Sequence, residues 1–194
     1  MTNDLCRMST AVGLVLCLAL AAACSPSKKA VPSTTTSIPK KSLAVSPNSG
    51  LVNMQSVKVT GEGFAASSDG NILECNGDPN QPTVALPAPV SSTVSVGCSA
   101  PSISGLTVTS SSGLLSTSYK VVEGTVGPPC GTSDALTECP AADSSGLSPA
   151  TDAAAYPCPP TPAQQAAGIV CVLTFGDAAG DTASAPISFA SENS

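Results

Sequence analysis

Cysteine is the residue type best able to do chemistry in this 194-residue chain, which contains nine cysteines and no histidine. Without histidine, Ser-His-Asp triads, His-ligated zinc sites and HExxH sites are excluded. A zinc site built from cysteines alone needs closely spaced pairs such as C-x-x-C, and the sequence has none. We therefore expect no metal site, and we expect the thiols to form disulfides or to be modified.

The N-terminal segment 1–23 has the features of a bacterial export signal. Its uncharged run from Met8 to Ala23 is about 16 residues long, shorter than the roughly 20 apolar residues of a membrane span. The run Leu20-Ala-Ala-Ala leads directly into Cys24 and resembles the lipobox of bacterial lipoproteins. The resemblance implies that Cys24 is lipidated and anchors the exported protein to the outer face of the cell membrane. The alternative is an ordinary secretory signal that is cleaved after Ala23.

The number of cysteines agrees with the lipoprotein interpretation. Removal of the signal takes away Cys6 and Cys17, and lipidation occupies Cys24. The remaining cysteines can pair completely in an oxidising compartment, without a free thiol. These expected disulfide cysteines are Cys75, Cys98, Cys130, Cys139, Cys158 and Cys171.

Residues 24–42 are expected to form a flexible tether. They are rich in Ser, Thr and Pro and have almost no apolar side chain to bury. The lysines of this segment would lie against anionic lipid on an anchored protein. Alternatively, they only keep the linker soluble. The lysines are Lys28, Lys29, Lys40 and Lys41.

Charge and motif content exclude several classes of function. The formal net charge is −6 and the sequence pI is about 4.3, which is the wrong sign for contact with phosphates, so no nucleic-acid partner is expected. The chain has no Walker phosphate loop, no G-x-G-x-x-G and no G-x-S-x-G elbow. We therefore expect no enzyme activity, no catalytic residue and no cofactor.

From residue 43 onward, short apolar runs of β type are separated by Gly, Pro, Asn and Ser. This pattern predicts an all-β protein, an immunoglobulin-like antiparallel β-sandwich of about seven to nine strands over residues 43–190 with a tail at 191–194. The best candidate helix, Ala163–Ala167, is about one turn long. The expected strands are Leu43–Val45, Val57–Thr60, Ile72–Cys75, Thr83–Leu86, Val94–Val96, Leu106–Thr109, Tyr119–Val122, Ile169–Phe175 and Pro186–Phe189.

Both ends of the expected sandwich resemble the neocarzinostatin family of apoproteins. The resemblance covers roughly residues 43–130 and 171–190. Its first part taken alone is also typical of IPT/TIG immunoglobulin-like modules. The matching runs are Val45–Leu51, Val57–Phe64, Cys171–Gly180 and Pro186–Phe189.

Within these runs, three side chains have expected structural roles. Phe64 should close one end of the core. Asp177 and Asp181 should cap the turn between the last two strands, since two carboxylates do not supply the oxygen ligands that calcium needs.

The resemblance also implies a disulfide pattern. Family members join two cysteines on neighbouring strands, which corresponds to Cys75 with Cys98. Their second bridge precedes the final hairpin and corresponds to Cys130 with Cys171. We then expect a nested bridge between the two remaining cysteines, Cys139 and Cys158. The alternative is two local loops, Cys130 with Cys139 and Cys158 with Cys171.

Residues 131–170 have no counterpart in the family. They are rich in proline and carry acidic but no basic side chains. We expect an irregular surface loop, held only by its cysteines, that acts as a lid or partner-contacting arm near the ligand crevice.

The resemblance implies that the domain carries a small apolar ligand in a crevice at the open end of the sandwich, an enediyne chromophore in the antibiotic-producing members. Such carriers hold the chromophore with aromatic side chains, which are scarce here. The expected function is therefore a non-catalytic lipoprotein module that binds a small hydrophobic ligand or an envelope protein. The alternative is a surface adhesion or scaffolding domain without a pocket, and a further hypothesis is an enediyne-chromophore carrier or resistance protein.

Overall fold

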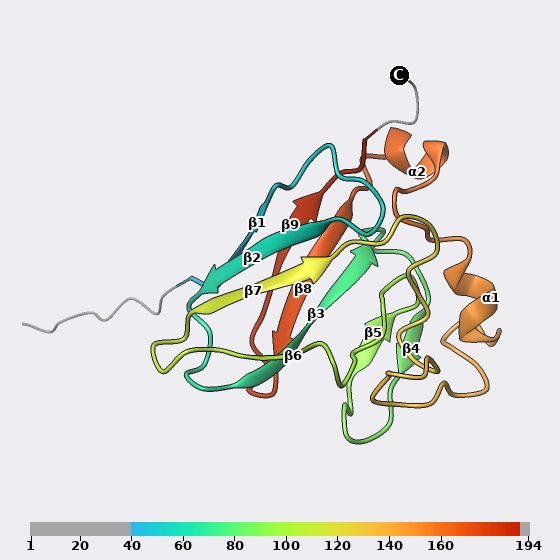
Figure 1. Cartoon of the computed structure of the whole chain (residues 1–194). Helices are drawn as coiled ribbons and strands as arrows, with labels where there is room; N and C mark the ends of the chain where they lie inside the picture. The colour runs from blue at the N-terminus through green and yellow to red at the C-terminus, as the bar shows by residue number, and fades with distance from the viewer. Residues whose placement is uncertain (1–39, 191–194) are drawn as a thin grey trace, which may run out of the picture. The chain divides into compact units, whose positions relative to one another are not determined.

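The computed structural model describes residues 40–190 (Figure 1). The expected signal segment, Cys24, the tether up to residue 39 and the tail lie outside the described residues. The described residues form an antiparallel β-sandwich with an additional two-stranded ribbon. Within residues 40–190, no helix is long and apolar enough to span a membrane.

The two sheets of the sandwich differ in size, and their strands cross one over the other in Figure 1. The three-stranded sheet has the order β1 (Ser42–Ser46), β2 (Ser56–Glu62) and β7 (Leu115–Lys120). The four-stranded sheet has the order β6 (Leu106–Val108), β3 (Asp69–Asn76), β8 (Cys171–Asp177) and β9 (Thr182–Ile187). The ribbon consists of β4 (Thr83–Ala85) and β5 (Thr93–Ser95).

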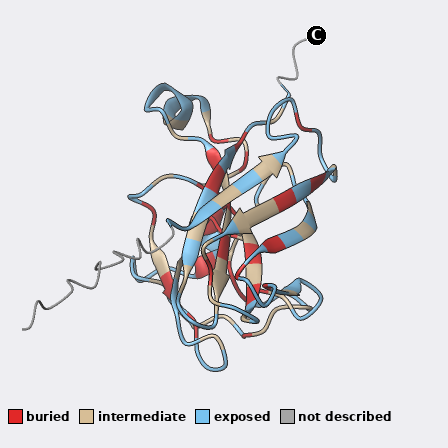
Figure 2. Cartoon of the chain, turned by 90° about the vertical axis from the view of Figure 1, so that its left-hand side faces the viewer, coloured by how far each residue is buried: buried red, intermediate tan, exposed pale blue. Residues whose placement is uncertain are grey.

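The core lies between the two sheets because each strand turns alternate side chains inward. Val57 and Val59 of β2 are buried, whereas Lys58 between them is exposed. Leu173 and Phe175 of β8 belong to the same buried cluster. Figure 2 shows buried and exposed positions alternating along the strands. The period-two pattern that predicted strands therefore also identifies the inner face.

Phe64 closes one end of this core, as the sequence predicts. Its side chain is buried, and its ring packs edge-to-face against Phe175 with centroids 4.8 Å apart. Aromatic pairs in this geometry contribute about 0.5–1.5 kcal/mol beyond their burial.

Two strands begin four residues before their expected bounds. β7 begins at Leu115 rather than Tyr119 because Gly113, with a φ of +74°, reverses the chain and lets Leu115 enter the core. β9 begins earlier than expected because its small residues pair fully with β8 although they give no clear apolar alternation. Phe189 lies beyond β9 and is held by an isolated bridge to Leu51.

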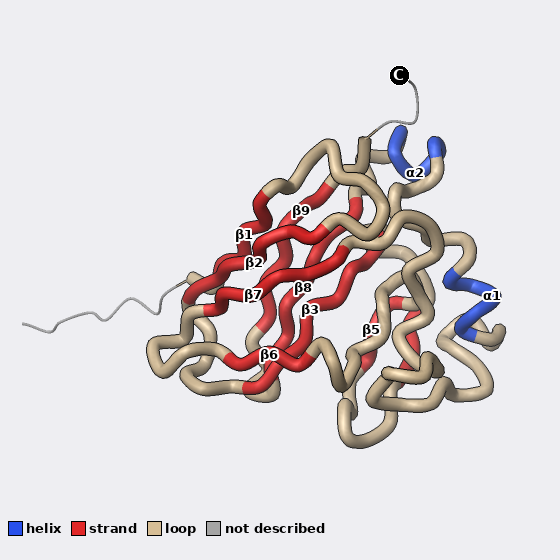
Figure 3. The backbone as a smooth tube through the Cα atoms, in the orientation of Figure 1, coloured by secondary structure: helices blue, strands red, loops and turns tan. Residues whose placement is uncertain are grey.

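The insertion 131–170 is mostly irregular but contains two short helices, α1 (Pro149–Ala153) and α2 (Pro162–Ala166) (Figure 3). Ser148 caps α1, and Thr161 forms a capping box with Gln164 in α2. These caps stabilise two short helices in a segment whose apolar residues do not follow a helical period.

The insertion also packs against the ribbon, so the expectation that only cysteines hold it is wrong. A second buried cluster joins Val84, Leu86 and Val96 of the ribbon region to Cys130, with Cys139 and Tyr156 packed against it. Ala153 of α1 is fully buried. The insertion contributes Cys139 and Tyr156 to this packing.

The disulfides follow the local alternative rather than the nested expectation. Cys75 is bonded to Cys98, the pair that the family resemblance implied. Cys130 is bonded to Cys139, and Cys158 to Cys171. The nested pairing fails because Cys158 lies next to β8 in the main core, whereas Cys130 and Cys139 lie together in the second cluster.

Candidate ligand-binding groove

The outer face of the four-stranded sheet forms the floor of a groove of about 750 Å³. Because Leu173 and Phe175 point into the core, their neighbours Val172, Thr174 and Gly176 point outward. Leu73 of β3 pairs with Thr174 and also lines the groove. The floor is therefore a continuous strip from two hydrogen-bonded central strands.

The walls of the groove come from segments that are distant in the sequence. Val90 and Val94, from the ribbon and its turn, line one part, while Pro101 and Leu106 line another. The insertion contributes Leu136, whose amide donates to the Pro101 carbonyl over 2.9 Å. The insertion thus supplies part of the wall, and its expected role as a lid stays a hypothesis.

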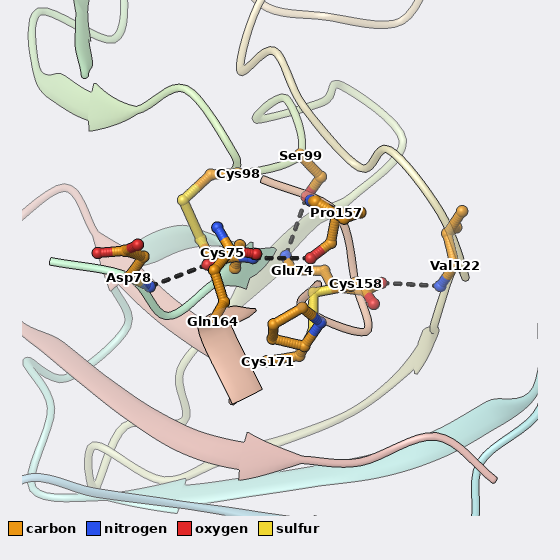
Figure 4. The surroundings of a disulfide bond; sticks show 12 residues. Glu74, Cys75, Asp78, Cys98, Ser99, Val122, Pro157, Cys158, Gln164 and Cys171 are labelled. Carbon is orange, nitrogen blue, oxygen red and sulfur yellow. Dashed lines mark hydrogen bonds between the residues drawn. A yellow bond between two sulfur atoms is a disulfide. The ribbon is translucent and has the colours of Figure 1, made fainter. Parts of the chain in front are cut away.

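A disulfide and its surroundings brace one end of the groove (Figure 4). Cys75 and Cys98, which also line the groove, join β3 to the segment after β5. Ser99 follows directly, and its hydroxyl accepts a 2.9 Å hydrogen bond from the Glu74 amide. These links hold the ribbon side of the groove to the sandwich.

A buried glutamine fixes the same end. Gln81 Nε2 donates to the carbonyl oxygens of Asn76 and Asp78 over 2.7 and 2.9 Å, and its Oε1 accepts from the Gly97 amide over 2.7 Å. The Asn76 side chain in turn donates to the Pro157 carbonyl in the insertion over 2.8 Å. Strand β3, the ribbon and the insertion therefore meet in one hydrogen-bonded network.

Glu74 lies behind the groove floor and points into the core. Its side chain is fully buried, and Oε2 accepts a 2.8 Å hydrogen bond from the Val122 amide. Burial raises the pKa of Glu74 to about 7, although the Val122 hydrogen bond opposes part of that rise. Burial also raises the pKa of Tyr119, whose hydroxyl lies 3.2 Å from Ser99 Oγ, to about 12. Glu74 gave no sequence signal, since an isolated glutamate in a strand is usually exposed.

The other end of the groove is the turn between β8 and β9. Asp177 Oδ1 accepts hydrogen bonds from the amides of Ala179 and Asp181, so Asp177 caps the turn as expected. Asp181 has a different role. It pairs with Lys41 Nζ at 2.8 Å and accepts from the Ala65 amide at 2.8 Å, and the hydrogen bond from Lys41 lowers its pKa.

Charge in the groove is of one sign. Asp69, Asp78 and Asp177 are the charged residues among its described lining, and the remaining lining side chains are apolar or neutral. In the described part of the chain, no group of three or more His, Cys, Asp or Glu side chains is placed to hold a metal ion.

The aromatic side chains lie elsewhere. Phe64 and Phe175 are in the core, Phe189 and Tyr119 pack against it, and Tyr156 packs in the second cluster. The apolar part of the described groove lining is aliphatic, and the sequence analysis did not identify it as a binding surface. The outward-facing positions of the strand expected over 169–175 were the part of the sequence that could have indicated the groove floor.

A smaller cavity of about 300 Å³ lies beside α2. Pro160, Ile169 and Phe189 are among its lining residues. It shares no lining residue with the groove, and the inner residues Cys171 and Ile187 of the four-stranded sheet are part of its lining.

No family model and no curated protein matches this chain. Two solved structures are similar in fold. Macromomycin has 18% sequence identity and a TM-score of 0.42, over 78% of this chain and 100% of that chain. Apokedarcidin, in its solution conformation, has 19% identity and a TM-score of 0.39, over 78% of this chain and 99% of that chain.

Proposed function

We propose that this chain is an exported lipoprotein whose β-sandwich binds a small apolar molecule without catalysing a reaction. The observation that carries the binding proposal is the groove of about 750 Å³ on the outer face of β3 and β8. Ligand pockets in proteins commonly enclose about 300–1,000 Å³ and are lined mainly by apolar side chains. The groove meets both conditions through residues such as Leu73, Val172 and Leu136.

The surroundings of the groove support binding by a preformed site. The Cys75–Cys98 disulfide and the hydrogen bonds of Gln81 fix the ribbon relative to β3. The Cys130–Cys139 disulfide closes the loop that carries Leu136. A wall that is ordered before the ligand arrives loses less conformational entropy on binding.

Export is supported by the disulfides, because such bonds persist in oxidising compartments. We propose that the chain is cleaved before Cys24 and lipidated there, with residues 24–42 as the tether. The ion pair between Lys41 and Asp181 fixes the point where this tether would enter the domain. The roughly 17 residues between Cys24 and Lys41 would reach at most ~60 Å from the membrane.

The exposed edge of the four-stranded sheet favours a second candidate, a surface adhesion or scaffolding domain. Ile103 is 62% exposed, and Leu106 and Val108 of edge strand β6 are 52% and 57% exposed. An apolar strand edge of this kind is suited to pairing with another polypeptide. This candidate requires no ligand in the groove.

Native mass spectrometry of the protein purified from its own cell envelope separates these two candidates. A ligand-binding module should carry a small molecule of constant mass, and the groove-filling variant Gly176→Leu should lack it. A wild-type protein that carries no small molecule and binds no apolar probe would contradict the binding proposal and leave the scaffold candidate.

A further inference from the structure

We infer that edge strand β6 is the docking site for an extended, basic segment of a partner polypeptide, which adds to the four-stranded sheet as a further strand. This inference rests on the second candidate of the proposed function, the adhesion or scaffolding domain, because it names the partner that this candidate requires. Strand β6 presents backbone groups, side chains and charges that together define the partner.

The backbone of β6 has unpaired groups on the side away from β3. Thr109, directly after β6, donates its amide to the Ser68 carbonyl over 3.0 Å. The hydrogen-bonding direction alternates along an antiparallel ladder, so Thr107 bonds to β3, whereas Leu106 and Val108 direct their backbone groups away from it. Within residues 40–190, the Leu106 C=O group and both Val108 groups are thus left without a partner. Such an edge binds an extended peptide through main-chain hydrogen bonds.

A hydrogen bond on the other side of β3 supports this register. Asp69 is the β3 residue opposite Val108, and its carbonyl accepts from the Ala178 amide, just beyond β8, over 2.8 Å. Asp69 therefore directs its backbone groups toward β8. Gly70, the next residue of β3, faces Thr107 of β6.

The side chains of β6 favour an apolar neighbour. Leu106 and Val108 are exposed, and alternation places both on the outer face of the sheet, where Leu106 lines the groove. Proteins often protect edge strands with Lys or Pro. Strand β6 has neither, whereas β7, at the edge of the other sheet, exposes Ser116, Ser118 and Lys120. An added strand would therefore place apolar side chains beside Leu106 and Val108.

The insertion already pairs with the backbone that precedes β6. The Ile103 amide donates to the Asp134 carbonyl over 3.0 Å, and the Leu136 amide donates to the Pro101 carbonyl over 2.9 Å. The Leu106 amide donates to the Ile103 carbonyl over 3.5 Å. The free edge is thus limited to β6 itself, and side chains must contribute to recognition of the added strand.

The charges at the two ends of this edge favour a basic partner. Asp69 is exposed opposite Val108, and Asp134 accepts hydrogen bonds from the amide and the hydroxyl of Ser104, just before β6. None of the four strands of this sheet contains Lys or Arg. A second copy of the chain would bring the same acids and a net charge of −6, so repulsion opposes pairing between copies. Lys or Arg at the ends of an added strand would complement both aspartates.

Three nine-residue peptides test this partner. Each has a central stretch of five alternating valines and threonines, flanked at both ends by two lysines, two glutamines or two glutamates. Each peptide carries a fluorescent label and is titrated with the full mature chain by fluorescence anisotropy. We expect the lysine peptide to bind at least tenfold more tightly than the glutamate peptide, and this preference should shrink as salt concentration rises.

Proline substitution tests the backbone pairing. Val108→Pro removes an amide that points away from β3, so the ladder within the sheet is kept and thermal stability should be unchanged. We expect it to weaken the lysine peptide at least tenfold. Ser118→Pro is the matched control in β7. The Val121 amide donates to the Gln55 carbonyl over 3.0 Å, so the same alternation directs the Ser118 amide away from β2, and this variant should bind like the wild type.

A charge variant and the oligomeric state complete the test. Asp69→Asn should weaken the lysine peptide at least threefold and leave the glutamine peptide unchanged. Equal binding of the lysine and glutamate peptides, or wild-type affinity in Val108→Pro, overturns this inference alone. A wild-type dimer that Val108→Pro dissociates would overturn it in favour of a second copy. Failure of all three peptides to bind a monomeric wild-type protein overturns the adhesion candidate as well, whereas the groove is tested separately with an apolar probe.

Discussion

Glu74 Oε2 accepts a 2.8 Å hydrogen bond from the Val122 amide inside the sandwich, while its Oε1 has no hydrogen-bond partner among residues 40–190. This bond joins β3, which forms part of the groove floor, to the segment that follows β7. The buried carboxyl is favoured in its protonated form, which explains the rise of its pKa from 4.5 to about 7.

The stability of the domain should therefore depend on the protonation of Glu74. Its folded-state pKa is raised, so the folded state binds the proton more tightly than the unfolded state. This contribution is fully present below about pH 4.5 and is lost as pH rises through about 7. Between pH 5 and 8, the free energy of unfolding should fall by about 2–3 kcal/mol. Urea denaturation at both pH values measures this fall.

Glu74→Gln removes the titrating group and should flatten this dependence. We expect the variant to match or exceed the wild-type free energy of unfolding at pH 8, while it gains nothing at pH 5. Glu62→Gln, which alters an exposed carboxyl, should retain the wild-type slope. A slope in Glu74→Gln equal to that of the wild type would show that other groups cause the dependence.

The disulfide connectivity can be checked directly. Peptide mapping of the unreduced protein should recover the pairs Cys75–Cys98, Cys130–Cys139 and Cys158–Cys171. Removal of one bridge by paired Cys→Ala substitution should lower the free energy of unfolding by about 2–4 kcal/mol. Recovery of a Cys130–Cys171 peptide would contradict the fold of the insertion.

Gln81 should contribute more to stability than its type suggests. Gln81→Ala leaves the carbonyls of Asn76 and Asp78 and the amide of Gly97 without their partner. We expect a loss of about 2 kcal/mol, because unsatisfied buried polar groups cost about 1–3 kcal/mol each and water relieves part of that cost. Gln165→Ala is the control, since the side chain of exposed Gln165 makes one hydrogen bond, to the Pro160 carbonyl. Thermal unfolding of both variants measures this difference. An equal fall of the two midpoint temperatures would contradict a special role of Gln81.

Much of the fold could be predicted from the sequence because its signals are local. Alternating valines in Val57–Thr60 mark β2, and the aromatic Phe64 after Gly63 marks the end of the core. The turn after Asp177 follows from its side-chain capping chemistry. Each of these features depends on residues that are neighbours in the chain.

The groove could not be predicted in the same way. Its floor consists of the outward residues of β3 and β8, and its walls bring Val94 and Leu136 together from segments about 40 residues apart. The sheet order that places them is a long-range property. The disulfide pairing likewise depended on where the insertion packs, which no spacing of cysteines reveals.

Anchoring is tested by Cys24→Ala expressed in the native host. The wild-type protein should enter the detergent-rich phase on phase partitioning, and the variant should enter the aqueous phase, because two acyl chains provide stable membrane binding. Ser27→Ala, a neighbouring change that leaves the thiol intact, should behave like the wild type. Equal partitioning of Cys24→Ala and wild type would exclude lipidation at this residue.

Gly176 is the position at which a substitution tests the groove most directly. It lines the floor, and a Cβ atom built on it would meet one neighbour, Thr182 Cγ2, at 3.8 Å. Its φ is not in the left-handed region, so a side chain can be added without backbone strain. Gly176→Leu should therefore fill the groove and leave the sandwich folded. Ser118→Leu adds the same side chain to an exposed position of β7 in the other sheet and serves as the matched control.

Titration of wild type, Gly176→Leu and Ser118→Leu with neutral diphenylhexatriene is the measurement that tests the binding groove most directly. Wild type and Ser118→Leu should bind one probe per chain with equal affinity, and Gly176→Leu should bind it at least tenfold more weakly at unchanged thermal stability. Equal binding by all three proteins would place the apolar site elsewhere and contradict the proposed function of the groove.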